Sequence, residues 1–234
     1  MKFQVLYEDN HLLVIDKPAG WVVQGAQPAD KSILGEAKIY LARKYAKPGQ
    51  VFLGVVSRLD RAVTGVVPLA RTSKAAARLS EQLRQRKVRK IYWALVAGGT
   101  GEAQGSLHHW LSRDERAAKT LCDSQPRPGA AEAILHYRCL AAWPSCRLLE
   151  IELETGRKHQ IRAQLAAIGC SILGDARYGS KIGWKLDAIA LHCKSLTFEH
   201  PTLRQAMTFS AKLPQLWLDR LPAPWQNGWE LSPP

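Results

Sequence analysis

Residues 148–154, in the second half of the chain, constrain the fold most. Leu149, Ile151 and Leu153 alternate there with three glutamates. Because successive side chains of a β-strand point to opposite faces of a sheet, this alternation predicts a strand with one buried and one solvated face. Such a strand is not stable alone, so the rest of the sequence must supply its hydrogen-bonded neighbours.

Further strands are predicted where short apolar runs are bounded by turn-forming residues, at 3–7, 12–15, 51–56, 66–70 and 91–96. The first two enclose a turn-forming cluster, which predicts a hairpin. A charged turn at 57–65 separates the third from the fourth, so Asp60 is expected in a loop between strands. Surface loops are expected at 98–105, which is rich in glycine, and at 124–129, which contains two prolines.

Three short helices are predicted from apolar residues at helical spacing. Residues 33–45 follow Ser32, a suitable N-cap, and a second helix is expected after Thr72. The third covers residues 161–168 and ends at Gly169, with Arg162 off its apolar stripe. Among the tryptophans near the C-terminus, Trp217, Trp225 and Trp229 are expected to cover the core.

The charge of the chain indicates a polyanionic partner. It has 33 Lys and Arg against 20 Asp and Glu, a net charge of +13, which suits RNA, DNA or an anionic membrane. No signal peptide and no run of 18 apolar residues is visible, so a soluble, cytoplasmic protein without membrane contact is expected. The five cysteines include no Cys-x-x-Cys pair, which indicates reduced thiols.

Several reaction classes lose support from missing motifs. The seven histidines show no zincin spacing and no neighbouring cysteine pair, so no metal is expected. There is no G-x-S-x-G elbow and no P-loop pattern, which argues against a serine hydrolase and an NTPase. Three polar clusters remain inside apolar sequence: Ser57-Arg58-Leu59-Asp60, Lys90-Ile91-Tyr92 and Gly156-Arg157-Lys158-His159-Gln160-Ile161-Arg162.

In this order, the clusters resemble the motifs of the RluA-type pseudouridine synthases, and the similarity extends from Tyr7 to about Phe209. The run Gly174-Asp175-Ala176-Arg177-Tyr178-Gly179 is similar to the segment that follows the family's arginine motif. Three positions depart from the family pattern. Ser57 replaces a histidine, Val63-Thr64 replaces Thr-Ser, and Gln24-Gly25 stands where His-Pro is common.

The resemblance implies an α+β fold with a long mixed, mainly antiparallel sheet, flanking helices and a central active-site cleft. Residues 1–234 are expected to form a single catalytic domain with no separate S4 RNA-binding domain. The implied function is isomerisation of specific uridines to pseudouridine in structured RNA, either rRNA or tRNA, by a monomer with no obligate protein partner and no cofactor. Because residues around Asp60 are altered, a non-catalytic RNA-binding homologue of the same fold is the alternative. A basic DNA-binding protein is a third reading, but no helix-turn-helix or zinc-finger spacing is visible.

The resemblance also implies the roles of the catalytic residues. Asp60 corresponds to the catalytic carboxylate, which attacks the ribose, attacks the base or removes a ribose proton. Tyr92 corresponds to the residue that stacks on the flipped uracil, and Arg162 to the partner that keeps the carboxylate ionised. Arg58 corresponds to the residue that fills the space left by the flipped base.

Two further assignments come from the sequence itself. The basic run before the tyrosine motif is predicted to contact phosphates. His159 and His192 are expected to orient loops or to satisfy hydrogen bonds in the core. The basic run comprises Arg84, Arg86, Lys87, Arg89 and Lys90.

Overall fold

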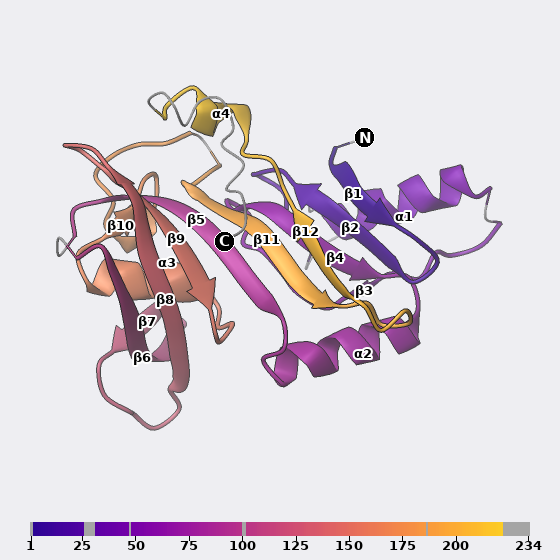
Figure 1. The fold of residues 1–234 in the computed structure, drawn as a ribbon, viewed down its shortest axis with the longest axis horizontal. Coiled ribbons are helices and arrows are strands. Elements are labelled where there is room, and N and C mark those ends of the chain that lie inside the picture. Colours follow the sequence, from indigo (N-terminus) through magenta and orange to yellow (C-terminus); the bar gives the residue numbers. More distant parts are fainter. Residues whose placement is uncertain (1, 26–30, 47, 100–101, 186, 222–234) are drawn as a thin grey trace.

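The computed structural model describes residues 2–25, 31–46, 48–99, 102–185 and 187–221. Within them a single mixed sheet is flanked by a few helices (Figure 1). The strands are β1 (Gln4–Glu8), β2 (Leu12–Lys17), β3 (Gly54–Val55), β4 (Thr64–Ala70), β5 (Arg89–Ala97), β6 (Gln104–Asp114), β7 (Lys119–Asp123), β8 (Ala131–Ala142), β9 (Arg147–Leu153), β10 (Ser171–Ile172), β11 (Leu191–Glu199) and β12 (Ala206–Ser210). The helices are α1 (Ile33–Lys44), α2 (Ser73–Arg84), α3 (Gln160–Ala167), η1 (Ala176–Tyr178) and α4 (Gln215–Leu218).

The sheet follows the path β1-β2-β4-β11-β5-β9-β8-β6-β7, and β3, β10 and β12 pair with β4, β5 and β11 beside this path. Among the named strands of the described chain, β4 with β11 is the one parallel pairing. Gly65 lies at this junction with φ +113°, and a Cβ there would collide with the carbonyl oxygen of Cys193. Only glycine fits this position. The α+β fold predicted from the sequence is confirmed.

The hairpin β1-β2 and the three predicted helices are confirmed. The side chains of Ser32 and Thr72 accept hydrogen bonds from backbone N–H groups in the first turns of α1 and α2, which stabilises each helix start. None of the described helices is long and apolar enough to cross a membrane.

Several expected boundaries are wrong. Within residues 51–56 only Gly54–Val55 forms a strand, and the loop expected at 98–105 is shorter because Gln104 and Gly105 already pair with β8. Strands β6, β7, β8, β10, β11 and β12 were not predicted from the sequence. The glutamates of residues 148–154 do face outward, but arginines of neighbouring segments pair with them: Arg138 with Glu150, Arg89 with Glu152 and Arg86 with Glu154.

The main core lies along the central strands, and a smaller cluster lies under α3. This second cluster contains Leu111, Ala133, Ala163 and Tyr178, so it joins β6 and β8 to α3 and η1. Trp217 in α4 is fully buried, as expected for a residue that covers the core. Trp225 and Trp229 lie outside the described residues.

Candidate active site

The loop that carries Asp60 leaves the sheet just before β4, next to the central strand β11. Its apolar members Leu59 and Val63 are buried, whereas the side chain of Asp60 remains 29% exposed. The backbone N–H of Val63 donates to the carbonyl oxygen of Asp60 at 3.1 Å and closes a turn. The loop is therefore anchored by its apolar side chains while its carboxylate stays accessible.

A buried lysine holds the same loop from the other side. Lys17, at the end of β2, is fully buried, and its Nζ donates to the carbonyl oxygens of Pro18 (2.8 Å), Trp21 (2.8 Å) and Arg61 (3.3 Å). Burial lowers its pKa to about 7, although the charges of Asp60 and of neighbouring Asp16 oppose this. Three carbonyl acceptors favour the ammonium form, because only that form has three N–H groups.

Arg162 joins the Asp60 loop to a second carboxylate, that of Asp175, which is buried. Its Nε and one Nη donate to the two oxygens of Asp175 at 2.7 and 2.8 Å, and the other Nη donates to Asp60 Oδ2 at 3.0 Å. Asp175 is 2% exposed and Arg162 is 9% exposed by side chain. These two carboxylates raise the pKa of Arg162 further above its ordinary value against the effect of burial. The guanidinium thus fixes one oxygen of Asp60.

The sequence placed Arg162 off the apolar stripe of its helix, yet its side chain is buried. The two carboxylates that face it offset the cost of burying its charge. A glycine allows this approach. Gly174, just before Asp175, has φ +82°, and a Cβ there would lie 2.5 Å from the Cβ of Trp184. Glycine is required at this tight contact.

His159 is the second neighbour of Asp60, with Nε2 3.6 Å from Oδ2. Its Nδ1 lies 3.0 Å from the hydroxyl of Tyr178, which also accepts the backbone N–H of Thr120 at 2.9 Å. A buried hydroxyl that already accepts one hydrogen is best satisfied by donating its own to Nδ1. This network assigns the His159 proton to Nε2, on the side of Asp60. Burial lowers the pKa of His159, which favours the neutral ring.

Tyr178 also supports Arg162, because the guanidinium carbon lies 4.9 Å from the centre of the tyrosine ring. Such a stack stabilises the cation. From its sequence context His159 was expected to have only a structural role, and no role was predicted for Asp175 or Tyr178. For Asp175 and Tyr178, the signal that could have identified them is their position in the run Gly174–Gly179 that follows the arginine motif.

Tyr92, on β5, is 8% exposed. Burial raises its pKa well above the ordinary value, and the thiol of Cys193 and the charge of Asp60 add to this effect. The phenol therefore stays protonated and lies within electrostatic reach of Asp60. The structure brings Asp60, Tyr92 and Arg162 to the centre of the sheet from a loop, a strand and a helix.

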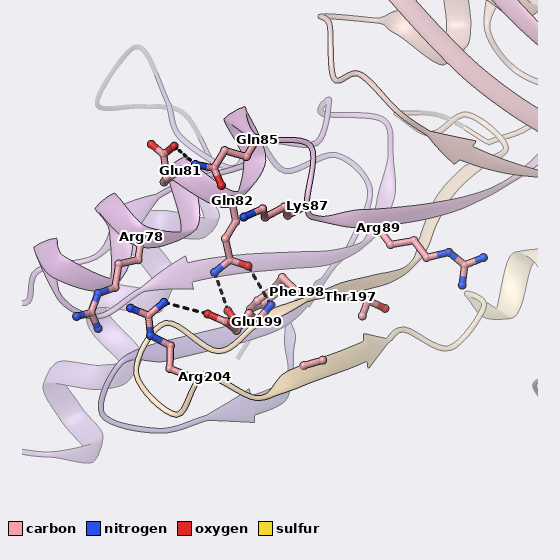
Figure 2. Close-up of a pocket in the computed structure, with 11 residues that line it drawn as sticks. Arg78, Glu81, Gln82, Gln85, Lys87, Arg89, Thr197, Phe198, Glu199 and Arg204 are labelled. Atoms are coloured by element: carbon pink, nitrogen blue, oxygen red, sulfur yellow. Dashed lines mark hydrogen bonds and ion pairs between the residues drawn. The ribbon is translucent and has the colours of Figure 1, made fainter.

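The predicted RNA-binding residues do not form one exposed cationic strip. Arg58 is exposed two residues before Asp60. Arg89 forms two contacts of 3.0 Å with Glu152, Arg86 contacts Glu154 at 2.7 Å, and Arg84 pairs with Glu81. Lys90 is buried, and its Nζ donates to the carbonyl oxygen of Thr155 at 3.3 Å. Lys87 is exposed and lines the groove of Figure 2.

No group of three or more potential metal ligands occurs in the described part of the chain. Its five cysteines are free thiols, two of them buried. The described site contains two carboxylates, Asp60 and Asp175, the Arg162 guanidinium, the His159 imidazole and the phenols of Tyr92 and Tyr178. This set can position a charge and move protons beside a bound base.

Comparison with known proteins identifies the family. A sequence profile described as RNA pseudouridylate synthase matches residues 11–167. The chain is 36% identical over 231 residues to ribosomal large subunit pseudouridine synthase D of Xanthomonas campestris, covering 90% of this chain and 66% of that protein. It is 32% identical over 213 residues to an uncharacterized RNA pseudouridine synthase of Synechocystis, covering 90% of this chain and 65% of that protein.

A third relative, ribosomal large subunit pseudouridine synthase D of Pseudomonas aeruginosa, is 32% identical over 240 residues, covering 93% of this chain and 71% of that protein. The chain thus spans slightly less than two thirds of the first two relatives and slightly more of the third. Among solved structures, human RNA pseudouridylate synthase domain containing 4 superposes with a TM-score of 0.75 at 25% identity, covering 92% of this chain and 90% of that one. The resemblance found in the motifs is confirmed, and the chain belongs to the RNA pseudouridylate synthase family.

Proposed function

We propose that this protein isomerises uridine to pseudouridine in RNA and that Asp60 is its catalytic carboxylate. The observation that carries the proposal is the contact of 3.0 Å between Arg162 and Asp60, in a chain of this family. At this distance the guanidinium supplies a charge-assisted hydrogen bond that fixes the direction of the carboxylate. His159 lies against the same oxygen, so the other oxygen of Asp60 remains for the substrate.

The reaction breaks the bond between ribose C1′ and uracil N1 and forms a bond between C1′ and C5. The proton that leaves C5 is balanced by one gained at N1, so no redox partner or group carrier is needed. Asp60 acts at the ribose or the base. The hydroxyl of Tyr92 relays the C5 proton by taking it up as it gives up its own, and its ring stacks on the uracil. This stack contributes about 1 to 3 kcal/mol.

The RNA must present its uridine outside the helical stack. Extrusion costs a few kcal/mol and is least costly in a loop, so a structured RNA with a looped uridine is the proposed substrate. Arg58, exposed beside Asp60, fills the space that the base leaves. Of the basic run predicted to contact phosphates, Arg84, Arg86, Lys87 and Arg89 are exposed and are kept in the proposal, whereas Lys90 is buried and is left out.

Ribosomal RNA is the proposed substrate class, since two of the relatives are named for the large ribosomal subunit. In its simplest form, the proposal is that the protein acts on ribosomal RNA as a monomer in the cytoplasm, without a cofactor or an obligate protein partner. The active-site cleft is proposed to lie over the centre of the sheet, beside Asp60 and the strand that carries Tyr92.

The alternative is a non-catalytic RNA-binding homologue of the same fold. The variant Asp60→Asn separates the two, because the amide keeps the size of the side chain but is a poor nucleophile and base. RNA from cells that lack the gene is incubated with each protein, and pseudouridines are then mapped. Asp60→Asn is expected to form none while its RNA affinity stays within about twofold, since phosphates and stacking dominate binding.

The control is Asp219→Asn, which removes an exposed carboxylate at the end of α4. This variant should retain full activity. Melting temperatures are measured for both variants, because removing a partner of a buried ion pair destabilises a protein. A folded Asp60→Asn protein that converts uridine at the wild-type rate contradicts the proposed mechanism. A wild-type protein that binds RNA but forms no pseudouridine favours the non-catalytic alternative.

A further inference from the structure

Three cations surround the network that contacts Asp60, and they come from three different elements. Lys119 begins β7, Lys158 precedes α3, and Arg177 lies in η1. Lys158 and Arg177 are exposed, and Lys119 is half-buried. Lys158 directly precedes His159 in the chain, and Arg177 directly precedes Tyr178, whose hydroxyl lies 3.0 Å from His159 Nδ1. The ammonium of Lys119 lies 5.0 Å from the centre of the Tyr178 ring.

Hydrogen bonds hold these elements together. The side chain of Thr120 donates to the carbonyl oxygen of Lys158 at 3.0 Å, and Arg177 donates to the carbonyl oxygen of Ala118 at 3.3 Å. The backbone N–H of Thr120 donates to Tyr178. The β6-β7 hairpin is thereby fixed to the segments before α3 and around η1. The backbone segments that carry the three cations consequently have defined places next to the active site.

Like some exposed cations elsewhere in the described chain, such as Arg58 and Lys87, these three have no carboxylate partner, and their place beside the Asp60 network sets them apart. Among the described residues, no Asp or Glu oxygen lies within 4.0 Å of the charged nitrogens of Lys119, Lys158 or Arg177. Arg86 and Arg89, by contrast, are paired with glutamates. A paired arginine must break or share its contact to bind a phosphate, whereas an unpaired cation exchanges only solvent ions.

The groove of Figure 2 is the other candidate for a polyanion-binding surface. It has a volume of about 480 Å³ and is lined by Arg78, Lys87, Arg89 and Arg204. Two glutamates also line it, and Figure 2 shows the pair between Arg204 and Glu199, at 3.0 Å. Its positive charge is therefore partly neutralised, and none of its lining residues belongs to the Asp60 network.

We propose that Lys119, Lys158 and Arg177 form a phosphate-binding rim that holds the RNA backbone next to the uridine at Asp60. The proposal rests on the proposed function, because it takes RNA as the polyanion. Lys158 adjoins His159, which lies 3.6 Å from Asp60, so a phosphate on the rim belongs to the target nucleotide or to a near neighbour. A phosphate bound at the rim thus positions the uridine at Asp60 and also strengthens the binding of the RNA.

The test compares two double variants that remove equal charge. Lys158→Gln with Arg177→Gln removes two exposed members of the rim. Arg138→Gln with Arg204→Gln removes two exposed arginines that pair with glutamates. Binding of a fluorescent RNA stem–loop with a uridine loop is measured by anisotropy between about 50 and 200 mM salt.

The slope of log K against log salt should become shallower by roughly 1.4 to 1.8 for the rim variant, as expected for two lost phosphate contacts. The control should change by less than about half of that. Lys158→Arg with Arg177→Lys keeps both charges and should restore the wild-type slope. Melting temperatures confirm that each variant is folded, and both rim positions are exposed, so folding is not expected to suffer.

An unchanged slope in the rim variant, or an equal loss in the control, overturns the proposal and moves the RNA backbone elsewhere. Failure of the proposed function looks different, since the wild-type protein would then form no pseudouridine whatever the slopes are.

Discussion

Replacing Arg162 by lysine tests whether the shape of the guanidinium, in addition to its charge, holds Asp60 in place. The arginine makes three charge-assisted contacts, two with Asp175 and one with Asp60. A lysine has one nitrogen and cannot reach both carboxylates with the same fork. We expect it to stay with Asp175, which is 2% exposed and cannot be left without a partner, so the contact with Asp60 is lost.

The expected loss follows from that single contact. A hydrogen bond to a charged group is worth about 1.5 to 3 kcal/mol, and each 1.4 kcal/mol is about tenfold in rate. Single-turnover conversion of uridine with excess enzyme should therefore slow by roughly 10- to 150-fold. The melting temperature should also fall, because one contact with Asp175 is lost as well.

The matched control is Arg138→Lys, since Arg138 makes a single exposed contact of 2.7 Å with Glu150. Its rate should stay within about twofold of wild type, because surface pairs contribute little. An Arg162→Lys protein that is folded and turns over at the wild-type rate would refute the geometric argument and leave charge as the only requirement.

Two other perturbations test the surroundings of the site. Tyr178→Phe keeps the ring under Arg162 but removes the hydroxyl that orients His159, so the turnover rate should fall roughly 2- to 10-fold at saturating RNA. In a His159→Gln background the same change should have little further effect, and additive losses would contradict the coupling. His192 is fully buried, and burial lowers its pKa to about 3 from 6.5. The folded state therefore binds fewer protons than the unfolded state between these values, and wild type loses stability as pH falls below 6.5. His192→Asn lacks this effect, so its stability deficit in urea unfolding should shrink by about 2 kcal/mol from about pH 7.5 to about pH 5; a constant deficit would show that His192 does not stay neutral.

Local sequence patterns predicted much of the fold, because helix caps, turns and strand alternation depend on residues that are close together in the chain. The caps Ser32 and Thr72, the hairpin β1-β2 and strand β9 all follow from turn residues and from spacings of two or about four. Strands β6 to β8 were not predicted from these local patterns. In β6, only Leu107 and Leu111 are buried among eleven residues, so its period is weak, and its pairing with β8 supplies the stability that its own sequence does not show.

The motifs of the sequence also determined that Asp60 lies in a loop, and the family resemblance named its two partners. Only the tertiary structure decided how they meet. Arg162 is 102 residues from Asp60 along the chain, and its second carboxylate, Asp175, is reached only because Gly174 allows a tight turn. The register of β5 and β9, which sets Ile91 opposite Glu152, likewise brings Arg89, two residues earlier, within reach of the Glu152 carboxylate. Contacts between distant residues depend on how strands align, and short-range spacing carries no information on that alignment.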